Sequence, residues 1–234
     1  MLLPQNLQLN LDIIYRDEYL IAINKPHGLL VHKSKYVGEA DMFAVQLLRN
    51  QIGQYIWPCH RLDRKTSGVL LFSLDVETNS LVQQQFTNNE ISKKYLSIVR
   101  GYTDDDGVID YPLINEKGKQ QEALTKYKTL KRAEIDVPFG KFNTSRYSLV
   151  EVYPQTGRMH QIRKHFAHIF HPIIADRTHG CNKQNRLFKE RWNMITMTLH
   201  ASDISFIHPI TKSEVNIKAS VSDEFNRVNS IMGW

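Results

Sequence analysis

The commonest pattern along this chain is the alternation of apolar and polar residues, which is typical of β-strands that bury one face. Segments of this kind, and short apolar runs bounded by glycine, proline or polar clusters, recur from one end of the sequence to the other. The predicted strands cover residues 11–17, 19–26, 57–63, 66–74, 93–101, 107–113, 124–135, 145–154, 194–201, 203–209 and 213–219. Strands are therefore predicted to dominate the fold.

Helical spacing, in which apolar residues recur at intervals of three and four, is found in fewer segments. The predicted helices cover residues 39–52, 76–86, 156–170, 186–192 and 223–234. Asp75 and Ser222 precede two of them and are the expected N-caps. Residues 115–123 are polar and unpatterned, so an exposed excursion is expected there. Because helices fall irregularly between strands, the expected fold class is α+β, with a central mixed or antiparallel sheet flanked by helices.

The size and composition of the chain suit a protein with a sizeable core. With 234 residues and 41% hydrophobic content, we expect one domain over residues 1–234, built from two halves that share the sheet. No apolar run approaches the roughly 18 residues of a membrane span, and the first residues do not resemble a signal peptide. Cys59 and Cys181 form no C-x-x-C motif, which favours a reducing compartment. A cytoplasmic protein without membrane contact is expected.

The formal net charge of +6 is compatible with a polyanionic partner, although charge alone does not establish one. Cationic residues recur with aromatic residues among them. The cations are Lys93, Lys94, Arg100, Lys126, Lys128, Lys131, Arg132, Arg158, Arg163 and Lys164, and the aromatics are Tyr95, Tyr102, Tyr127 and Phe166. This distribution favours a folded nucleic acid over a membrane surface. An ordinary solvated surface is the alternative.

Four histidines close together in the sequence raise the question of a metal site. They are His160, His165, His168 and His171. No carboxylate or cysteine lies nearby, and the flanking residues are arginine, lysine or apolar residues, which disfavours a metal ion. We therefore expect no metal, and histidines that are solvated or face RNA.

The predicted helix 156–170 carries one apolar stripe. Its members are Met159, Ile162, Phe166 and Ile169. At 100° per residue, Arg163 falls at the edge of this stripe, so its stem can pack on the core while its guanidinium enters a cleft. The alternative is an arginine that extends to water.

The segment "CHRLDRKTSG" at residues 59–68 places one carboxylate, Asp63, among cationic residues. Aspartate is a good cap for a tight turn, so a structural role is one interpretation. The other is a carboxylate held ionised by neighbouring guanidinium groups, which suits a nucleophile or a base rather than a general acid. No second carboxylate stands at a comparable spacing, which disfavours a glycosidase.

Several segments match a known family in sequence and in order along the chain. They are "YLIAINKPHGLLVH", "HRLDRKTSG", "KKYLSIVRG", "PQTGRMHQIRKHFAHIFHPIIAD" and "TLHA". Together they resemble the RluA family of pseudouridine synthases over nearly the whole chain. The resemblance implies the pseudouridine synthase fold, with an active-site cleft across the sheet and without an S4 RNA-binding domain.

The resemblance also implies roles for individual residues. Asp63 falls on the family's catalytic aspartate, and Arg163 on the arginine that pairs with it. Tyr95 falls on the tyrosine that packs against the target base, although its strand pattern alone indicates only a half-buried tyrosine. The residues implied in RNA binding and base flipping are Arg61, Arg64, His60, Arg158 and Gln161.

One segment departs from the family pattern. "ADRTHG" stands where the family usually has G-D-x-x-Y-G, so Ala175 replaces a glycine and His179 a tyrosine. With "QNR" at 184–186, this variant resembles a subgroup that modifies tRNA at uridine 65, at the base of the T stem. The implied reaction is isomerisation of uridine to pseudouridine by a monomer, without cofactor or metal. A synthase acting on ribosomal RNA and a non-catalytic RNA-binding protein are the alternatives.

Overall fold

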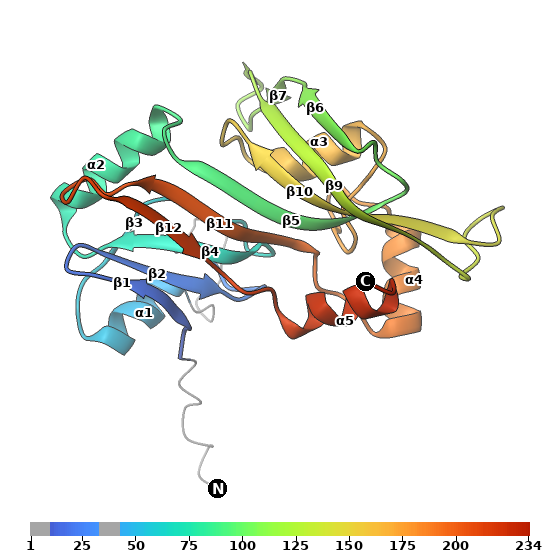
Figure 1. The fold of residues 1–234 in the computed structure, drawn as a ribbon, viewed down its shortest axis with the longest axis horizontal. Helices are drawn as coiled ribbons and strands as arrows, with labels where there is room; N and C mark the ends of the chain where they lie inside the picture. The colour runs from blue at the N-terminus through green and yellow to red at the C-terminus, as the bar shows by residue number, and fades with distance from the viewer. Residues whose placement is uncertain (1–9, 33–42) are drawn as a thin grey trace, which may run out of the picture.

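The computed structural model describes residues 10–32 and 43–234. Within them a large twisted sheet runs through the molecule, with helices on both of its faces (Figure 1). A second sheet consists of two short strands. Residues 39–42, the start of the predicted helix 39–52, lie outside the described residues.

The described elements comprise five helices and twelve strands. The helices are α1 (Ala44–Ile52), α2 (Val76–Thr87), α3 (Gln161–His168), α4 (Asn182–Trp192) and α5 (Asp223–Ile231). The strands are β1 (Ile13–Arg16), β2 (Leu20–Lys25), β3 (Trp57–Pro58), β4 (Ser67–Ser73), β5 (Ser92–Arg100), β6 (Asp106–Asp110), β7 (Leu113–Ile114), β8 (Gln120–Gln121), β9 (Leu124–Ile135), β10 (Ser145–Pro154), β11 (Leu199–Ile207) and β12 (Glu214–Lys218). The predicted N-caps are confirmed, since Asp75 and Ser222 accept hydrogen bonds from Thr78 N and Phe225 N.

The large sheet has the strand order β1-β2-β4-β11-β5-β10-β9-β6, with β3 pairing to β4 and β12 to β11. Strands β4 and β11 run parallel, whereas the other neighbouring pairs are antiparallel. The sheet is therefore mixed, and the predicted α+β fold class is confirmed. Strand β11, from the end of the chain, stands between β4 and β5 and joins the two parts of the sheet (Figure 1).

Gly68 permits the close parallel contact between β4 and β11. Its φ of +106° lies in a region that glycine adopts without strain, and a Cβ atom there would lie 2.1 Å from the carbonyl oxygen of Ala201. The two backbones therefore meet only a few residues after Asp63, which fixes the segment that carries this carboxylate against the sheet.

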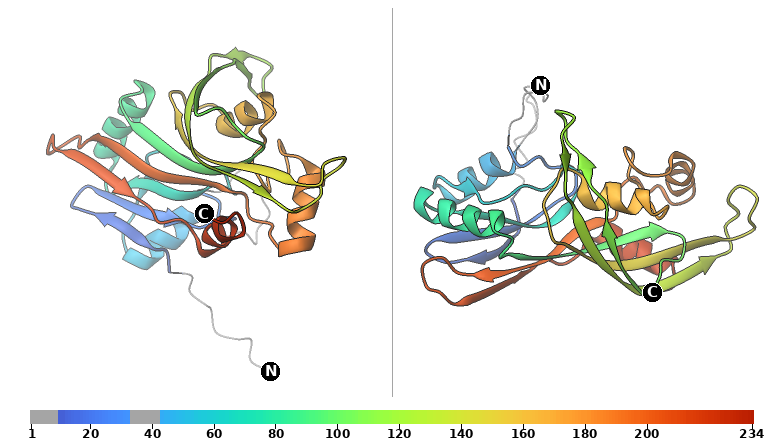
Figure 2. Two further views of the ribbon diagram at one scale, coloured as in Figure 1. Left: turned by 45° about the vertical axis from the view of Figure 1, so that its right-hand side comes forward. Right: turned by 90° about the horizontal axis from the view of Figure 1, so that it is seen from above.

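Helices cover opposite faces of the sheet because alternate side chains of each strand point to opposite sides. In the first part of the sheet, Ile21 and Ile23 belong to the core under α1, whereas Leu20 belongs to the core that contains Val82 of α2. In the second part α3 packs on one face and α4 and α5 on the other. Figure 2 shows the helices on both sides of the sheet.

The prediction for residues 156–170 was wrong at the start of the helix. Helix α3 begins only at Gln161, because the side-chain oxygen of this residue accepts hydrogen bonds from Thr156 Oγ1 and Arg158 N, 2.6 and 3.0 Å away. These bonds stabilise a turn before the helix. Met159 is consequently 46% exposed, whereas Ile162 and Phe166 are buried and Ile169 packs, partly buried, against the same core.

Four other predictions also differ from the structure. Residues 115–123 are largely exposed, as predicted, but they form the turn and the second strand of the hairpin β7–β8, whose turn is held by Asn115 Oδ1. The strands predicted at 194–201 and 203–209 contribute to one strand, β11, which continues across a register shift between Ala201 and Asp203 in its pairing with β5. Helix α4 begins earlier than predicted, at Asn182, and only Trp57 and Pro58 of the predicted strand 57–63 are extended partners of β4.

Candidate active site

A cleft of about 790 Å³ lies between the segment that follows β3, the end of α2, strand β5 and the turn before α3. Seven of the eight residues proposed from the sequence line it: Asp63, Tyr95, Arg163, His60, Arg61, Arg158 and Gln161. The eighth, Arg64, is not among the lining residues, and its Nε donates to Gly28 O, 3.0 Å away. The fold thus brings together residues that are far apart in the sequence.

Asp63 is held by a buried arginine. Arg163 Nη1 donates to Asp63 Oδ2 at 2.9 Å, while Nε and Nη2 donate to the two carboxylate oxygens of Asp176, at 2.7 and 2.8 Å. The side chains of Arg163 and Asp176 are only 5% and 1% exposed, whereas that of Asp63 is 28% exposed and faces the cleft. The guanidinium is therefore fixed from behind by Asp176 and presents its remaining edge to Asp63.

Electrostatics reinforce this arrangement. Burial by itself would raise the pKa of Asp176, but hydrogen bonds from Arg163 and from the backbone N–H groups of Thr178 and His179 outweigh it and lower that pKa. Burial likewise opposes the charge of Arg163, yet the bonds to its two carboxylates raise its pKa. Arg163 and Asp176 are thus both charged at neutral pH.

The carboxylate of Asp63 does not cap its own turn. In the turn over residues 63–66, Thr66 N donates to the backbone oxygen of Asp63 at 3.1 Å, which leaves the side chain available. Oδ2 accepts from Arg163, and Oδ1 accepts no hydrogen bond from any residue that the structure describes. The turn-cap interpretation of this side chain is therefore wrong. One oxygen is anchored and the other is free to act as a nucleophile or a base.

Tyr95 lies in β5 at the boundary of two core clusters and contributes to the wall of the cleft. Burial raises the pKa of its hydroxyl, and the negative charge of Asp63 raises it further. The phenol therefore stays protonated and offers an apolar ring beside the carboxylate.

His60 and Arg158 have fixed positions around the cleft. His60 Nε2 accepts from Leu71 N at 3.1 Å, and its ring lies 4.9 Å from that of Phe86. Burial lowers the pKa of His60 to about 4, with a further contribution from Lys93, so the imidazole is neutral. Arg158 Nε donates to Glu122 O at 3.0 Å.

Gln161 has a different position from the one expected of an RNA-binding side chain. It is only 4% exposed, and its NH₂ group donates to Leu124 O and Thr125 Oγ1 while its oxygen accepts from the turn before α3. These four bonds use the capacity of the amide. Gln161 therefore fixes the turn that carries Arg158 and does not present a free amide to the cleft.

Two residues near Asp63 were missed in the sequence. Asp176 was considered only as part of the segment "ADRTHG", although its acidic side chain could have marked it as a candidate site residue. Lys25 is fully buried, and its Nζ donates to the backbone oxygens of Pro26, Leu29 and Arg64 at 2.8–3.2 Å. Burial lowers its pKa to about 7, while Asp63 acts in the opposite direction. No local pattern reveals this contact.

The substituted segment is also close to Asp63. His179 Nε2 lies 2.9 Å from His160 Nδ1, and His160 Nε2 lies 3.9 Å from Asp63 Oδ2. Ala175, at the position where the family usually has glycine, adopts a φ of +62°, which costs an alanine strain that glycine would avoid. Asn185 holds this strained residue, since its Oδ1 accepts from Ala175 N at 2.9 Å.

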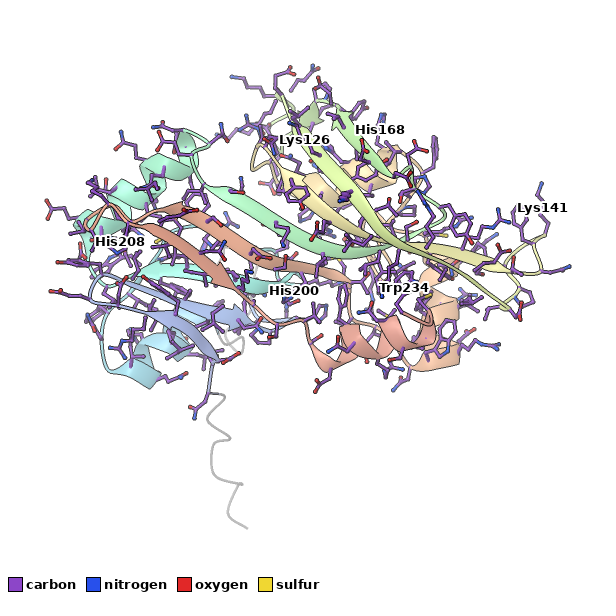
Figure 3. The ribbon with its side chains drawn as sticks, in the orientation of Figure 1. Lys126, Lys141, His168, His200, His208 and Trp234 are labelled. Atoms are coloured by element: carbon purple, nitrogen blue, oxygen red, sulfur yellow. The ribbon has the colours of Figure 1, made fainter. Side chains whose placement is uncertain are left out.

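The four clustered histidines have separate environments. His165 is fully buried rather than solvated, and its Nε2 lies 3.0 Å from Tyr111 O. His168 stacks on Tyr111 at 3.6 Å between ring centroids, and His171 Nδ1 lies 2.8 Å from Arg100 O. Figure 3 labels one of the four, His168, and shows it far from His200 and His208, two further histidines of the chain. Within the described residues no group of three potential metal ligands is found.

The comparisons with known proteins follow this geometry. Residues 19–168 match the family model described as RNA pseudouridylate synthase. The chain is 44% identical to tRNA pseudouridine synthase C of Vibrio cholerae, over 96% of each chain. It is 43% identical to tRNA pseudouridine synthase C of Haemophilus influenzae, over 96% of this chain and 98% of that one.

Solved structures have the same fold. Human RNA pseudouridylate synthase domain containing 4 superposes with a TM-score of 0.74 at 24% identity, covering 95% of this chain and 93% of that one. Human RNA pseudouridylate synthase domain containing 1 gives 0.73 at 22% identity, over 94% and 86%. None of the described helices is long and apolar enough to cross a membrane. The family predicted from the motifs is confirmed: this chain belongs to the RNA pseudouridylate synthases of the RluA type, and it is an isomerase.

Proposed function

We propose that this chain converts uridine to pseudouridine in tRNA, with Asp63 as the catalytic carboxylate and uridine 65 of the T stem as the target. The observation that carries the proposal is the geometry of Asp63, which faces the cleft with one oxygen held by Arg163 and the other unbonded by any described residue. The tRNA substrate is supported by relatives named tRNA pseudouridine synthase C.

The reaction suits a single carboxylate. The C1′–N1 bond breaks, the uracil rotates, and a C1′–C5 bond forms; the proton leaves C5 and N1 ends protonated, so the nucleotide keeps its composition. Nothing is added or removed, so no cofactor is needed. The free oxygen of Asp63 either attacks the sugar or removes a sugar proton, and either role requires the ionised form that Arg163 stabilises.

Neighbouring groups support this chemistry. Tyr95 would pack its ring against the uracil while the base is detached, and its protonated hydroxyl lies on the side of Asp63. Pro154, Ile162 and Leu199 line the same cleft and would exclude water during this step.

A uridine in a stem must leave the helix to reach Asp63. Flipping a paired base costs a few kcal/mol, which contacts to the surrounding RNA must offset. Arg61 is exposed at the cleft and is proposed to fill this role, with His60, Arg158 and, beside the cleft, Arg64 contacting the strand. Gln161 would act indirectly, by fixing the turn that carries Arg158.

The test is release of tritium from C5-labelled uridine in unmodified tRNA, with ribosomal RNA in parallel. Wild type and the control Asp106→Asn, an exposed carboxylate in β6, should release tritium from tRNA. Asp63→Asn should release none while keeping its fold, because the change preserves shape and removes the charge. Normal turnover by Asp63→Asn would reject the catalytic assignment, and release only from ribosomal RNA would reject the tRNA substrate. Mapping the modified position then tests uridine 65.

A further inference from the structure

A second hollow, of about 440 Å³, lies beside α4 and shares no lining residue with the catalytic cleft. Its walls are unusually cationic. They are formed by Ala175, Arg177, Asn182, Asn185, Arg186, Lys189, Glu190, Met194 and Ile195. Three cations therefore face one acid in a polar concavity, which is a surface suited to an anion.

Arg177, which lines this hollow, also lies near cations around the turn of residues 63–66. Burial lowers the pKa of His27 to about 4, and the charges of Lys25, Lys65 and Arg177 contribute to the shift. Burial also lowers the pKa of Lys65, again with a contribution from Arg177. Since such effects act over short distances, the loops that carry these residues lie close together.

These positive charges are not neutralised within the part of the protein that the structure describes. Lys65, Arg177, Arg186 and Lys189 form no ion pair with any described acid. Asp176, next to Arg177 in the sequence, is engaged with Arg163, and Glu190 is the one acid that lines the hollow. Unpaired cations that repel one another cost free energy. They are typical of a surface that meets a polyanion.

A chain of hydrogen bonds also links the hollow to Asp63. Asn185 accepts from Ala175 N at 2.9 Å and donates to Asp176 O at 2.7 Å. Asp176 in turn holds Arg163, which holds Asp63. An anion bound in the hollow would therefore lie at a fixed position relative to the reacting carboxylate.

We propose that Lys65, Arg177, Arg186 and Lys189, called here the cationic strip, bind the phosphate backbone of the tRNA next to the nucleotide held in the cleft. The inference rests on the proposed function and specifies which surface receives the RNA. Arginine and lysine suit this ligand because they neutralise phosphates along a strand without reading the bases. Three of these cations line one hollow, so together they could contact more than one phosphate.

The test compares two triple variants with equal loss of charge. The strip variant carries Arg177→Gln, Arg186→Gln and Lys189→Gln. The control carries Arg16→Gln, Lys212→Gln and Lys218→Gln. These three cations are exposed, in β1, in the turn before β12 and in β12, and line neither the cleft nor the hollow.

The measurement is the Kd for an unmodified tRNA as a function of salt, which requires no turnover. The strip variant should bind at least roughly tenfold more weakly at low salt, and the slope of log K against log salt should decrease by about one for each cation that faces a phosphate. The control should keep the wild-type slope within about half a unit. An unchanged slope in the strip variant, or equal losses in both variants, would overturn the proposal.

Tritium release by wild type separates this inference from the proposed function. If wild type forms pseudouridine in tRNA but the strip variant keeps the wild-type slope, the strip is rejected and the proposed function stands. If wild type releases no tritium but the strip variant alone loses tRNA affinity, tRNA binding by the strip stands and the catalytic proposal is rejected.

Discussion

At the residue scale, the guanidinium of Arg163 donates hydrogen bonds to two carboxylates, those of Asp176 and Asp63, which differ in their burial. Asp176 is buried and takes two hydrogen bonds, while Asp63 takes one and remains partly exposed. Because a buried arginine without its partner is strongly disfavoured, Asp176 keeps Arg163 in place whether or not Asp63 is engaged with substrate. The arginine is thus preorganised before the RNA arrives.

This division predicts the effect of Asp176→Asn. The amide of asparagine is neutral and has a single oxygen acceptor, so it cannot replace both charged hydrogen bonds to Arg163. The guanidinium should therefore lose its fixed position, and its positive charge would be compensated only in part. We expect tritium release to fall at least about tenfold and the free energy of unfolding to fall by about 3 kcal/mol. Single-turnover rates and urea unfolding check the two effects.

Asp106→Asn, on the surface, is the matched control and should change neither quantity. A normal rate in Asp176→Asn would show that the position of Arg163 does not depend on this carboxylate.

The sequence predicted the residues of the site unevenly. Asp63 was found because it is a lone acid within a distinctive motif, and Arg163 because helical spacing placed it beside buried residues. Asp176 and Lys25 were missed because their roles depend on contacts across the fold. Gln161 was assigned to RNA because the motif does not show that its amide is satisfied internally.

At the element scale, the turn that carries Asp63 is attached to the loop that follows β2. Gly28 N donates to Arg64 O at 2.8 Å, and Arg64 Nε donates back to Gly28 O. The ammonium of Lys25 links the two segments, because its three donors match the backbone oxygens of Pro26, Leu29 and Arg64. The turn that carries Asp63 therefore depends on a side chain in a neighbouring strand.

We expect Lys25→Met to destabilise the protein by about 3 kcal/mol, because three carbonyl groups would lose a buried donor. Activity should also fall, since the position of the turn is less well fixed. Thermal unfolding and tritium release at a temperature well below the transition measure these effects. Lys218→Met, at an exposed position of β12, is the control. Unaltered stability in Lys25→Met would mean that the loops hold without the ammonium.

The elements were predicted best where one pattern is long. Residues 124–135 and 145–154 were placed to the residue, because alternation persists over many positions in β9 and β10. The start of α3 was misplaced because the side chain of Gln161, rather than the apolar spacing, determines where the helix begins. The hairpin β7–β8 was missed because strands of two residues are too short to carry an alternation signal.

At the scale of the whole molecule, several histidines are kept neutral by the fold. Burial lowers the pKa of both His27 and His60 to about 4, and lowers those of His165 and His200 as well. An unfolded histidine has a pKa of about 6.5. Between pH 4 and 6.5 the unfolded chain therefore binds more protons than the folded one, and stability must decrease as the pH falls.

We expect the free energy of unfolding to decline as the pH falls, by at most about 1.4 kcal/mol per pH unit for each group whose pKa the fold lowers. Lys25 contributes around pH 7 and above, and the buried histidines contribute below pH 6.5. Urea unfolding between pH 7.5 and 4.5 measures the slope. His60→Gln should reduce it, because the amide can still accept from Leu71 N but does not titrate. A stability that stays flat below pH 6.5 would contradict the effect.

The position of β11 has a consequence for synthesis on the ribosome. Its first residue is Leu199, so most of the chain must be translated before the strand that fills the gap between β4 and β5 exists. A nascent chain that already contains Asp63, Tyr95 and Arg163 still has two unpaired strand edges, which invite association with other chains. We therefore expect catalytic competence to arise abruptly once β11 has been translated, and products truncated before Leu199 to aggregate.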